Sequence, residues 1–276
     1  MLSFIVALAC TKAGDVPSDS GVVEDTDDSA EPVSYPSSYE SGKYRAESLV
    51  IVEDLEGGGD VDGDGDTENK LPQVLVLVDI ATTQDLGADD INATLEADID
   101  DGTIVVLSEL AYAEGSLTQN ILLGSLDESE AIVVDPMSYD DAGVPNSRLS
   151  GIFQDETTYR TKADRILLPF PIQADEPPFL VPLEMVVIEG TVTDETVTGF
   201  MYGAVPVDDL IDDIVDPITP TGDDYDPADF QDMERDEFLQ YLRELGNDEN
   251  VSDIELSDGR RAVSAALTFE ANAADW

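Results

Sequence analysis

The stretch "FLVPLEMVVIEGTVTDETVTGFMYGAVPV", residues 179–207, decides the fold class of this chain. It contains two runs rich in Val, Thr and aromatic residues, which are the residue types that favour β-strands. Between the runs, the near mirror "TVTDETVT" predicts a hairpin that turns at Asp194–Glu195, although neither residue favours the positive φ of the tightest turns. Because a short hairpin joins antiparallel strands, we expect an antiparallel sheet.

Similar short apolar runs recur along the chain, separated by Gly, Pro, Asp and Asn. They are "AESLVIVEDL", "TIVVLSELAYA", "LTQNILLGSL", "AIVVDPM", "DRILLPFPIQ" and the terminal "AVSAALTFEA". In the terminal run, apolar residues occupy every second position, which predicts that one face of this strand is buried. These residues are Val263, Ala265, Leu267 and Phe269.

Two segments near the middle of the chain are helix candidates. The run "LPQVLVLVDIATTQ" fits either a buried strand or a helix with Pro72 in its first turn, and we favour the helix. In "ADDINATLEADIDDG" we expect Asp89 or Asp90 to cap a helix that ends at Gly102. The residues expected on its buried face are Ile91, Leu95 and Ile99.

An acidic helical segment is expected at about residues 207–247. Its first part, "DDLIDDIV", places Leu210, Ile211, Ile214 and Val215 on one face. Farther on, Asp226–Pro227 resembles a cap and first-turn pair, before a helix that ends at Gly246. We expect the apolar stripe of that helix to pack on the sheet, and a docking face for a partner is the alternative. The stripe residues are Phe238, Tyr241, Leu242 and Leu245.

The predicted fold is therefore α+β and β-dominant, with an antiparallel sheet or sandwich and a few packed amphipathic helices. Pro169, Pro171 and Pro182 cannot donate ladder hydrogen bonds, so we expect edges or bulges at these positions. The chain has 276 residues, 63 acidic and 12 basic, for a formal charge of −51. Such a charge argues against nucleic acid as a partner, because phosphate binding depends on Lys and Arg.

The N-terminus predicts export. "MLSFIVALAC" has a short apolar run before Cys10, the only cysteine, and resembles a bacterial lipobox, although Ala7 and Leu8 reverse the usual order. This resemblance implies that residues 1–9 are a signal peptide and that Cys10 is lipidated. Residues 10–42 would then form a disordered acidic tether, because they contain too little apolar surface to fold. Residues 43–276 would form a single globular β-rich domain.

The loop "GGGDVDGDGDTENKL", residues 57–71, places an acid at every second position. Asp60, Asp62, Asp64, Asp66 and Glu68 match positions 1, 3, 5, 7 and 9 of the EF-hand calcium loop, in which a Gly at position 6 permits the sharp turn. The loop thus resembles EF-hand, dockerin and thrombospondin type 3 calcium loops. We expect these five residues to bind a structural calcium ion, and a flexible solvated Asp/Gly linker is the alternative.

The loop departs from the EF-hand pattern at position 12, where Leu71 replaces the bidentate Glu. The missing ligands would have to come from elsewhere, and we consider Glu53, Asp54 and Asp79 as candidates. Zinc is not expected, because it prefers His and Cys, and magnesium prefers fewer carboxylates.

Three functions remain open from the sequence. We favour a non-enzymatic binding or structural module, and the alternatives are a carrier of an apolar ligand or lipid and a carboxylate-dependent hydrolase. The chain has no histidine, which excludes Ser-His-Asp and Cys-His catalysis, so we assign no catalytic residue.

Several longer segments resemble uncharacterised secreted lipoproteins of myxobacteria and related deltaproteobacteria. They are "DVDGDGDTENKLP", "DINATLEADIDDGTIVVLSEL", "LLPFPI", "GAVPVDDL" and "ALTFEA". The resemblance implies an exported lipoprotein, held in the cell envelope by a lipid anchor at Cys10, at the outer membrane or cell surface.

Overall fold

The computed structural model describes residues 37–276, except 56, 83–86, 172–177, 223–224 and 231. The proposed signal peptide and lipidation site Cys10 lie outside the described residues, as does the tether before residue 37. The first strand begins at Ser41, so the folded domain starts slightly before the predicted boundary at residue 43.

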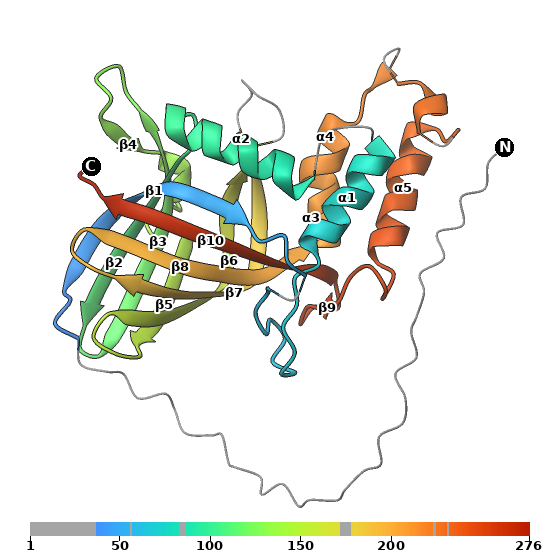
Figure 1. Cartoon of the computed structure of the whole chain (residues 1–276). Helices are drawn as coiled ribbons and strands as arrows, with labels where there is room; N and C mark the ends of the chain where they lie inside the picture. Colours follow the sequence, from blue (N-terminus) through green and yellow to red (C-terminus); the bar gives the residue numbers. More distant parts are fainter. Residues whose placement is uncertain (1–36, 56, 83–86, 172–177, 223–224, 231) are drawn as a thin grey trace, which may run out of the picture. The chain divides into compact units, whose positions relative to one another are not determined.

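The centre of the domain is a closed antiparallel β-barrel (Figure 1). The sheet closes because β1 pairs with β2 on one side and with β10 on the other. Two short strands, β4 (Ile132–Val134) and β9 (Ile254–Glu255), extend it beside β3 and β10. The barrel strands in spatial order are β1 (Ser41–Ile51), β2 (Val105–Ala113), β3 (Ser116–Leu126), β5 (Ser147–Phe153), β6 (Thr158–Phe170), β7 (Phe179–Val192), β8 (Thr196–Pro206) and β10 (Arg261–Ala273).

The structure confirms the β-dominant antiparallel prediction. The hairpin predicted at Asp194–Glu195 joins β7 to β8, with Val192 paired to Val197. In β10, Val263, Ala265 and Leu267 of the predicted buried face belong to the core. Burial does not alternate, however, because every residue from Ala262 to Leu267 is buried, and the acidic loop packs against Ala262 and Ala266 on the other face. Closure into a barrel was not predicted, and neither was β5, because "SRLSGIF" is short and contains few apolar residues.

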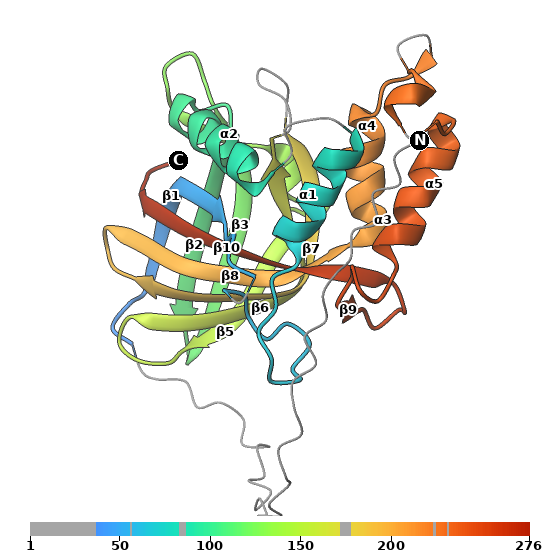
Figure 2. The same cartoon turned by 45° about the vertical axis from the view of Figure 1, so that its right-hand side comes forward.

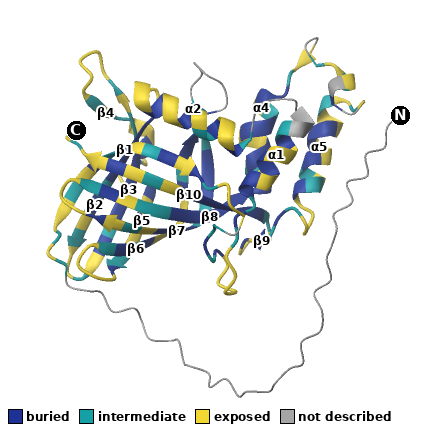
Figure 3. Cartoon of the chain, viewed as in Figure 1, coloured by how far each residue is buried: buried dark blue, intermediate teal, exposed yellow. Residues whose placement is uncertain are grey.

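Buried side chains fill the interior of the barrel. In Figure 3, buried and exposed residues alternate along much of the strands. A polar chain crosses this apolar core: Thr161 Oγ1 donates to Gln119 Oε1 at 2.8 Å, and Gln119 Nε2 donates to Ser108 Oγ at 3.2 Å. A cavity of about 30 Å³ adjoins Ser108 and Gln119. That volume suits one or two water molecules and is too small for a lipid chain.

Aromatic side chains close the end of the barrel at which β1 begins. Phe153 contacts the rings of Tyr39, Tyr112 and Tyr159, with centroid separations of 5.9, 5.1 and 6.3 Å. Tyr44 is buried beside them, and its hydroxyl donates to the carbonyl of Thr193 at 2.7 Å. Because Tyr39 takes part in this cluster, residues that we assigned to the tether belong to the folded domain.

Helices lie along β1 and beside one end of β7, β8 and β10 (Figures 1 and 2). Directly after β8, the chain forms α3, the π-helical turn η2 and α4 without a break. None of the helices in the described residues is long and apolar enough to span a membrane. The helical elements are α1 (Leu71–Thr82), α2 (Ala88–Asp101), η1 (Pro136–Ser138), α3 (Val207–Leu210), η2 (Ile211–Val215), α4 (Asp216–Ile218), η4 (Pro227–Asp229) and α5 (Arg235–Gly246).

The predictions of α1 and α2 are confirmed, with one correction at the start of α2. α1 has Pro72 in its first turn, and α2 ends at Gly102, whose φ is 81°. However, α2 begins after Gly87 without a side-chain cap, so Asp89 and Asp90 lie within its first turn. Their charges favour that end of the helix through its dipole.

The acidic helical segment also differs from expectation. Asp226 caps the short turn η4 and does not begin α5, which starts at Arg235. The apolar stripe of α5 packs against the α3–η2 helix instead of directly on the sheet. Phe238 and Leu242 are buried, whereas Tyr241 is 36% exposed.

Pro169 and Pro182 lie at the end of the β6–β7 pair where neither strand pairs with another neighbour. Pro182 is paired with Leu167, and Pro169 with Leu180. The β5–β6 ladder does not reach this region, and the β7–β8 ladder starts only at Glu184, after which a bulge follows. Each of these prolines therefore has a ladder partner on one side only, which is the edge or bulge setting predicted for them.

Candidate calcium-binding loop

The acidic loop, residues 57–70, connects β1 to α1 and lies against the outer face of β8 and β10. Its Val61 is buried in a small apolar cluster with Tyr202 and Ala204 of β8 and Ala262 and Ala266 of β10. This contact fixes the base of the loop on the barrel wall, while Asp62 and Asp64 remain exposed.

Glycines bring the two ends of the acidic loop together. Gly59 and Glu68 form an antiparallel bridge, in which the Glu68 amide donates to the Gly59 carbonyl at 3.2 Å. A Cβ at Gly58 would lie 1.6 Å from the Glu68 carbonyl oxygen, and one at Gly59 would lie 2.3 Å from the Tyr202 ring. Only glycine therefore fits at these two positions.

Asn69 attaches the end of the acidic loop to the barrel. Its Nδ2 donates to the carbonyls of Val52 at 2.6 Å and Asp54 at 3.0 Å, and its Oδ1 accepts from the Ala266 amide at 3.1 Å. The adjacent Lys70 amide donates to Ser264 Oγ at 2.9 Å. Since Asn69 is 1% exposed, these bonds are shielded from water.

Three of the predicted ligands converge at the tip. Asp60, Asp62 and Asp64 each offer a carboxylate oxygen, and these atoms lie within 4.8 Å of one another. Oxygens that bind one calcium ion lie about 2.4 Å from it, so opposite ligands are at most about 4.8 Å apart. Gly63 and Gly65 have φ of 85° and 97°, which lets the chain curl so that alternate side chains face inward.

Backbone amides of the loop already order these carboxylates. The Gly63 amide donates to Asp60 Oδ1 at 2.7 Å, the Asp64 amide to Asp62 Oδ1 at 3.2 Å, and the Asp66 amide to Asp64 Oδ1 at 2.9 Å. The alternation read from the sequence therefore corresponds to a repeating side-chain-to-backbone turn.

Glu68 lies beside the triad and is electrostatically unfavourable there. Its Oε2 is buried and has no hydrogen-bond partner among the described residues. Burial, followed by the charges of Asp62, Asp253 and Asp64, raises the pKa of Glu68 from 4.5 to about 7. A cation among these carboxylates would reverse that penalty, because opposite charge favours the ionised form.

The other ligands considered from the sequence include Asp66, Glu53 and Asp79, and all three lie outside the convergent triad. Asp66 is exposed and is outside the convergent triad, although at position 7 an EF-hand loop uses the backbone carbonyl. Glu53 faces the groove between β1 and α2, and Asp79 lies on the third turn of α1, so neither belongs to the cluster of Asp60, Asp62 and Asp64.

Asp253 was not predicted and lies near Glu68. It accepts hydrogen bonds from the amide and the hydroxyl of Ser264 at 2.9 and 2.6 Å. No sequence pattern connects "VSDIEL" with a loop almost two hundred residues earlier, so only the β-barrel brings Asp253 to this site.

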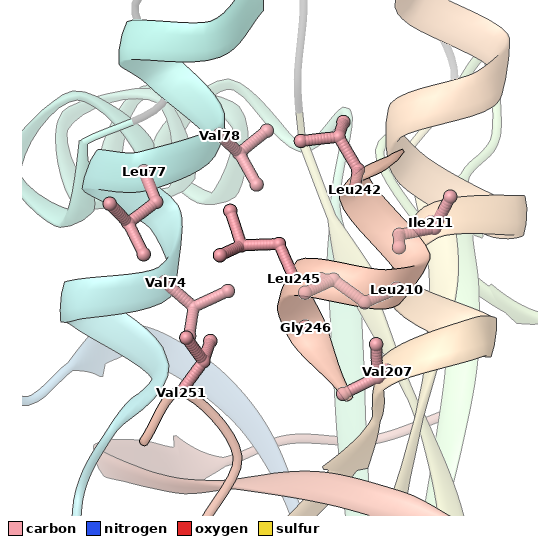
Figure 4. Close-up of a pocket in the computed structure, with 10 residues that line it drawn as sticks. All are labelled: Val74, Leu77, Val78, Val207, Leu210, Ile211, Leu242, Leu245, Gly246 and Val251. Carbon is pink, nitrogen blue, oxygen red and sulfur yellow. The ribbon is translucent and has the colours of Figure 1, made fainter. Parts of the chain in front are cut away.

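A second candidate site is an apolar groove between α1, the α3–η2 helix and α5 (Figure 4). Valine and leucine side chains from the three helices point towards one another there, with Val207 and Val251 at its lower end. The enclosed space is only about 30 Å³. It is therefore a packing gap between helices rather than a chamber for a ligand.

Comparison of the chain with protein-family models, with curated proteins and with solved structures found no match.

Proposed function

We propose that this chain is an exported, lipid-anchored β-barrel protein without enzymatic activity, braced by a structural calcium ion in the acidic loop. The observation that carries the proposal is the convergence of Asp60, Asp62 and Asp64, with the unpartnered carboxylate oxygen of Glu68 beside them. The three converging aspartates repel one another, and the charges of Asp62 and Asp64 also disfavour ionised Glu68; a bound cation would offset this repulsion.

Calcium suits this site better than other common ions. The site offers only oxygen ligands on an exposed turn, and calcium accepts roughly six to eight oxygens in variable geometry. Because the tip is exposed, water molecules can complete the coordination shell. We expect weak affinity, with a Kd on the order of 10⁻⁴–10⁻³ M, as in extracellular calcium modules.

The proposed role of the ion is to stabilise the link between the barrel and its helices. The acidic loop starts after β1, crosses the outer face of β10 and β8, and leads directly into α1. Neutralising its carboxylates would keep the Gly59–Glu68 bridge closed and hold α1 in place. In a chain of net charge −51, a bound divalent cation also reduces self-repulsion.

The proposed location of the protein rests on its N-terminal sequence. The lipobox-like Cys10 and the acidic segment that follows support attachment to the outer membrane or cell surface through a diacylglycerol. The resemblance to secreted myxobacterial lipoproteins supports the same location. An interior cavity of about 30 Å³ does not favour the alternative of a lipid carrier.

Thermal unfolding tests the calcium proposal. After treatment with a chelator, millimolar CaCl₂ should raise the Tm, and a Ca²⁺ titration in a calorimeter should give a saturable signal for one site. An Asp62→Asn/Asp64→Asn variant should lose both effects. The matched control is Asp140→Asn/Asp141→Asn, which changes the same charge in the exposed loop before β5. Equal Tm shifts in both variants would indicate nonspecific screening and contradict a defined site.

Metabolic labelling with a radioactive fatty acid tests the anchor. The full-length chain should incorporate label during expression in a Gram-negative host, and Cys10→Ala should remove it. If the wild-type chain remains unlabelled, the lipoprotein assignment is wrong, whatever the outcome of the calcium titration.

A further inference from the structure

A trough crosses the outer wall of the barrel on β6, β7 and β8, with a volume of about 420 Å³. Two rows of outward-facing residues form its walls. Across the strands, Thr158 pairs with Thr191 and Thr191 with Thr198, which gives one wall of three hydroxyls. Glu189 pairs with Phe200 and gives the opposite wall.

The floor between these walls is backbone. Gly190 and Gly199 pair with each other on β7 and β8. A Cβ at Gly190 would lie 2.6 Å from Cζ of Tyr159, and a Cβ at Gly199 would lie 2.7 Å from Cζ of Phe269. A side chain at either position would therefore point towards the barrel interior, where those rings leave room only for glycine. The outer floor between the two walls consists of ladder backbone because these positions face inward.

The dimensions of the trough follow from sheet geometry. Neighbouring strands are about 4.8 Å apart, so three strands give a length of about 10 Å. Rows two residues apart on a strand are separated by about 7 Å. A slot of this size accommodates one or two six-membered sugar rings, and its volume falls within the range of small-molecule sites.

The lining combines hydrogen-bonding groups with an aromatic ring. The hydroxyls of Thr191 and Thr198 are exposed, and Gln154 adds an exposed amide at one end. Glu189 is held in place by an ion pair to Arg160, with Nε and Oε1 separated by 3.3 Å. Phe200 is half-buried and packs against Tyr202, with ring centroids 5.6 Å apart, which fixes its orientation.

We propose that this trough binds a short segment of a neutral polysaccharide. A sugar ring has hydroxyls around its edge and C–H groups on its faces, so it needs both the polar wall and the aromatic one. An apolar ligand would leave the threonine hydroxyls unpaired. A polypeptide would need main-chain partners, and the floor amides and carbonyls are already paired in the β6–β7–β8 ladders.

The net negative charge of the protein favours a neutral glycan over an anionic one. The molecule carries a net charge of −51, which repels polyanions such as uronate or sulfate polymers. Glu189 is the one charged group in the trough lining, and its charge is compensated by Arg160. A neutral sugar meets no such repulsion and can accept or donate hydrogen bonds at both walls.

The test is NMR titration of the ¹⁵N-labelled protein with cellohexaose, maltohexaose and chitohexaose at millimolar concentration. We expect at least one of these sugars to shift the amide signals of Gly190, Thr191, Thr198 and Gly199 in a saturable way. If no sugar produces shifts, or if the shifts map elsewhere on the barrel, the proposal is overturned.

Near-isosteric variants separate binding from stability. Thr191→Val/Thr198→Val removes two hydroxyls and keeps residues that favour strands, and Phe200→Leu removes the aromatic face. Each variant should weaken binding by up to about tenfold, which corresponds to about 1.4 kcal/mol. The matched control is Thr118→Val on β3, where Thr118 lies between the inward-facing Leu117 and Gln119 and so faces outward. This variant should bind as the wild type does. Unchanged affinity in both trough variants would contradict the proposal.

Discussion

Asn69 Nδ2 lies 2.6 Å from the carbonyl oxygen of Val52, so one buried amide joins the end of the acidic loop to the chain that leaves β1. The same side chain also accepts from the Ala266 amide of β10 at 3.1 Å. The loop therefore sits on the barrel as a fixed element, even though its tip is exposed. Through this attachment, an ion bound at the tip would affect the stability of the whole fold.

We expect Asn69→Ala to lower the free energy of unfolding by about 3 kcal/mol, because it removes the side-chain partner of the Val52 carbonyl and of the buried Ala266 amide. Urea denaturation monitored by circular dichroism measures this. The matched control is Asn250→Ala, an exposed asparagine that bonds only to nearby Asp248. Similar losses for the two variants would show that Asn69 is not an anchor.

Gly58→Ala should open the acidic loop. The new Cβ would lie 1.6 Å from the Glu68 carbonyl oxygen, so the Gly59–Glu68 bridge cannot close without a backbone shift. We expect a lower Tm and a smaller increase in Tm on addition of calcium. Gly87→Ala before α2 is the control, since its Cβ would meet only the end of a side chain, at 3.2 Å. A normal calcium response in Gly58→Ala would argue against the bridge as part of the site.

The attachment of α5 should depend unequally on its two arginines. Arg235 pairs with Asp216 and donates to the carbonyls of Pro220 and Asp216 at 3.2 and 2.8 Å, whereas Arg243 pairs with the half-exposed Asp212. Arg235→Ala should therefore cost about 2 kcal/mol and Arg243→Ala less than about 1 kcal/mol. Hydrogen exchange of the α5 amides measures both. Faster exchange in Arg243→Ala than in Arg235→Ala would reverse this ranking.

Stability should depend on pH through Asp209, which pairs with Arg260 at 3.4 Å. Burial raises the pKa of Asp209 above 3.8, and the Arg260 charge partly opposes this. The folded state therefore binds more protons than the unfolded state just above pH ~4, so this group lowers stability as the pH rises through that window. Asp209→Asn should flatten the decline and Arg260→Gln should steepen it.

Urea midpoints measured between pH ~4 and neutrality check this prediction. Glu128→Gln, in the exposed turn before β4, is the matched control and should leave the slope unchanged. A steeper decline in Asp209→Asn than in the wild type would contradict the sign derived for Asp209.

Local patterns predicted most of the elements. The β7–β8 hairpin, the core-facing residues of β10 and the C-terminal glycine of α2 depend on neighbours in sequence, and all three were predicted. The start of α5 was misplaced, because an Asp-Pro pair caps a single turn as well as a longer helix. β5 was missed, because its burial comes from the strands on either side.

The candidate metal site was likewise predicted only in part. The alternate aspartates were visible in the sequence, since a chain that curls around one point presents every second side chain to it. The contributions of Asn69 and Asp253 were not visible, because Asn69 contacts Ala266 and Asp253 lies near Glu68, each across almost two hundred residues of sequence. The outer trough was not visible either, since its walls come from three strands whose register decides which threonines align.

The sequence alone determined the β-rich class, the positions of most strands and helices, and the curling acidic turn, because each depends on short-range periodicity and backbone preference. Only the tertiary structure decided that the sheet closes, with β1 pairing to β10. The reason is that closure, the attachment of the acidic loop and the alignment of the trough depend on contacts between distant residues. No local pattern encodes the register of those contacts.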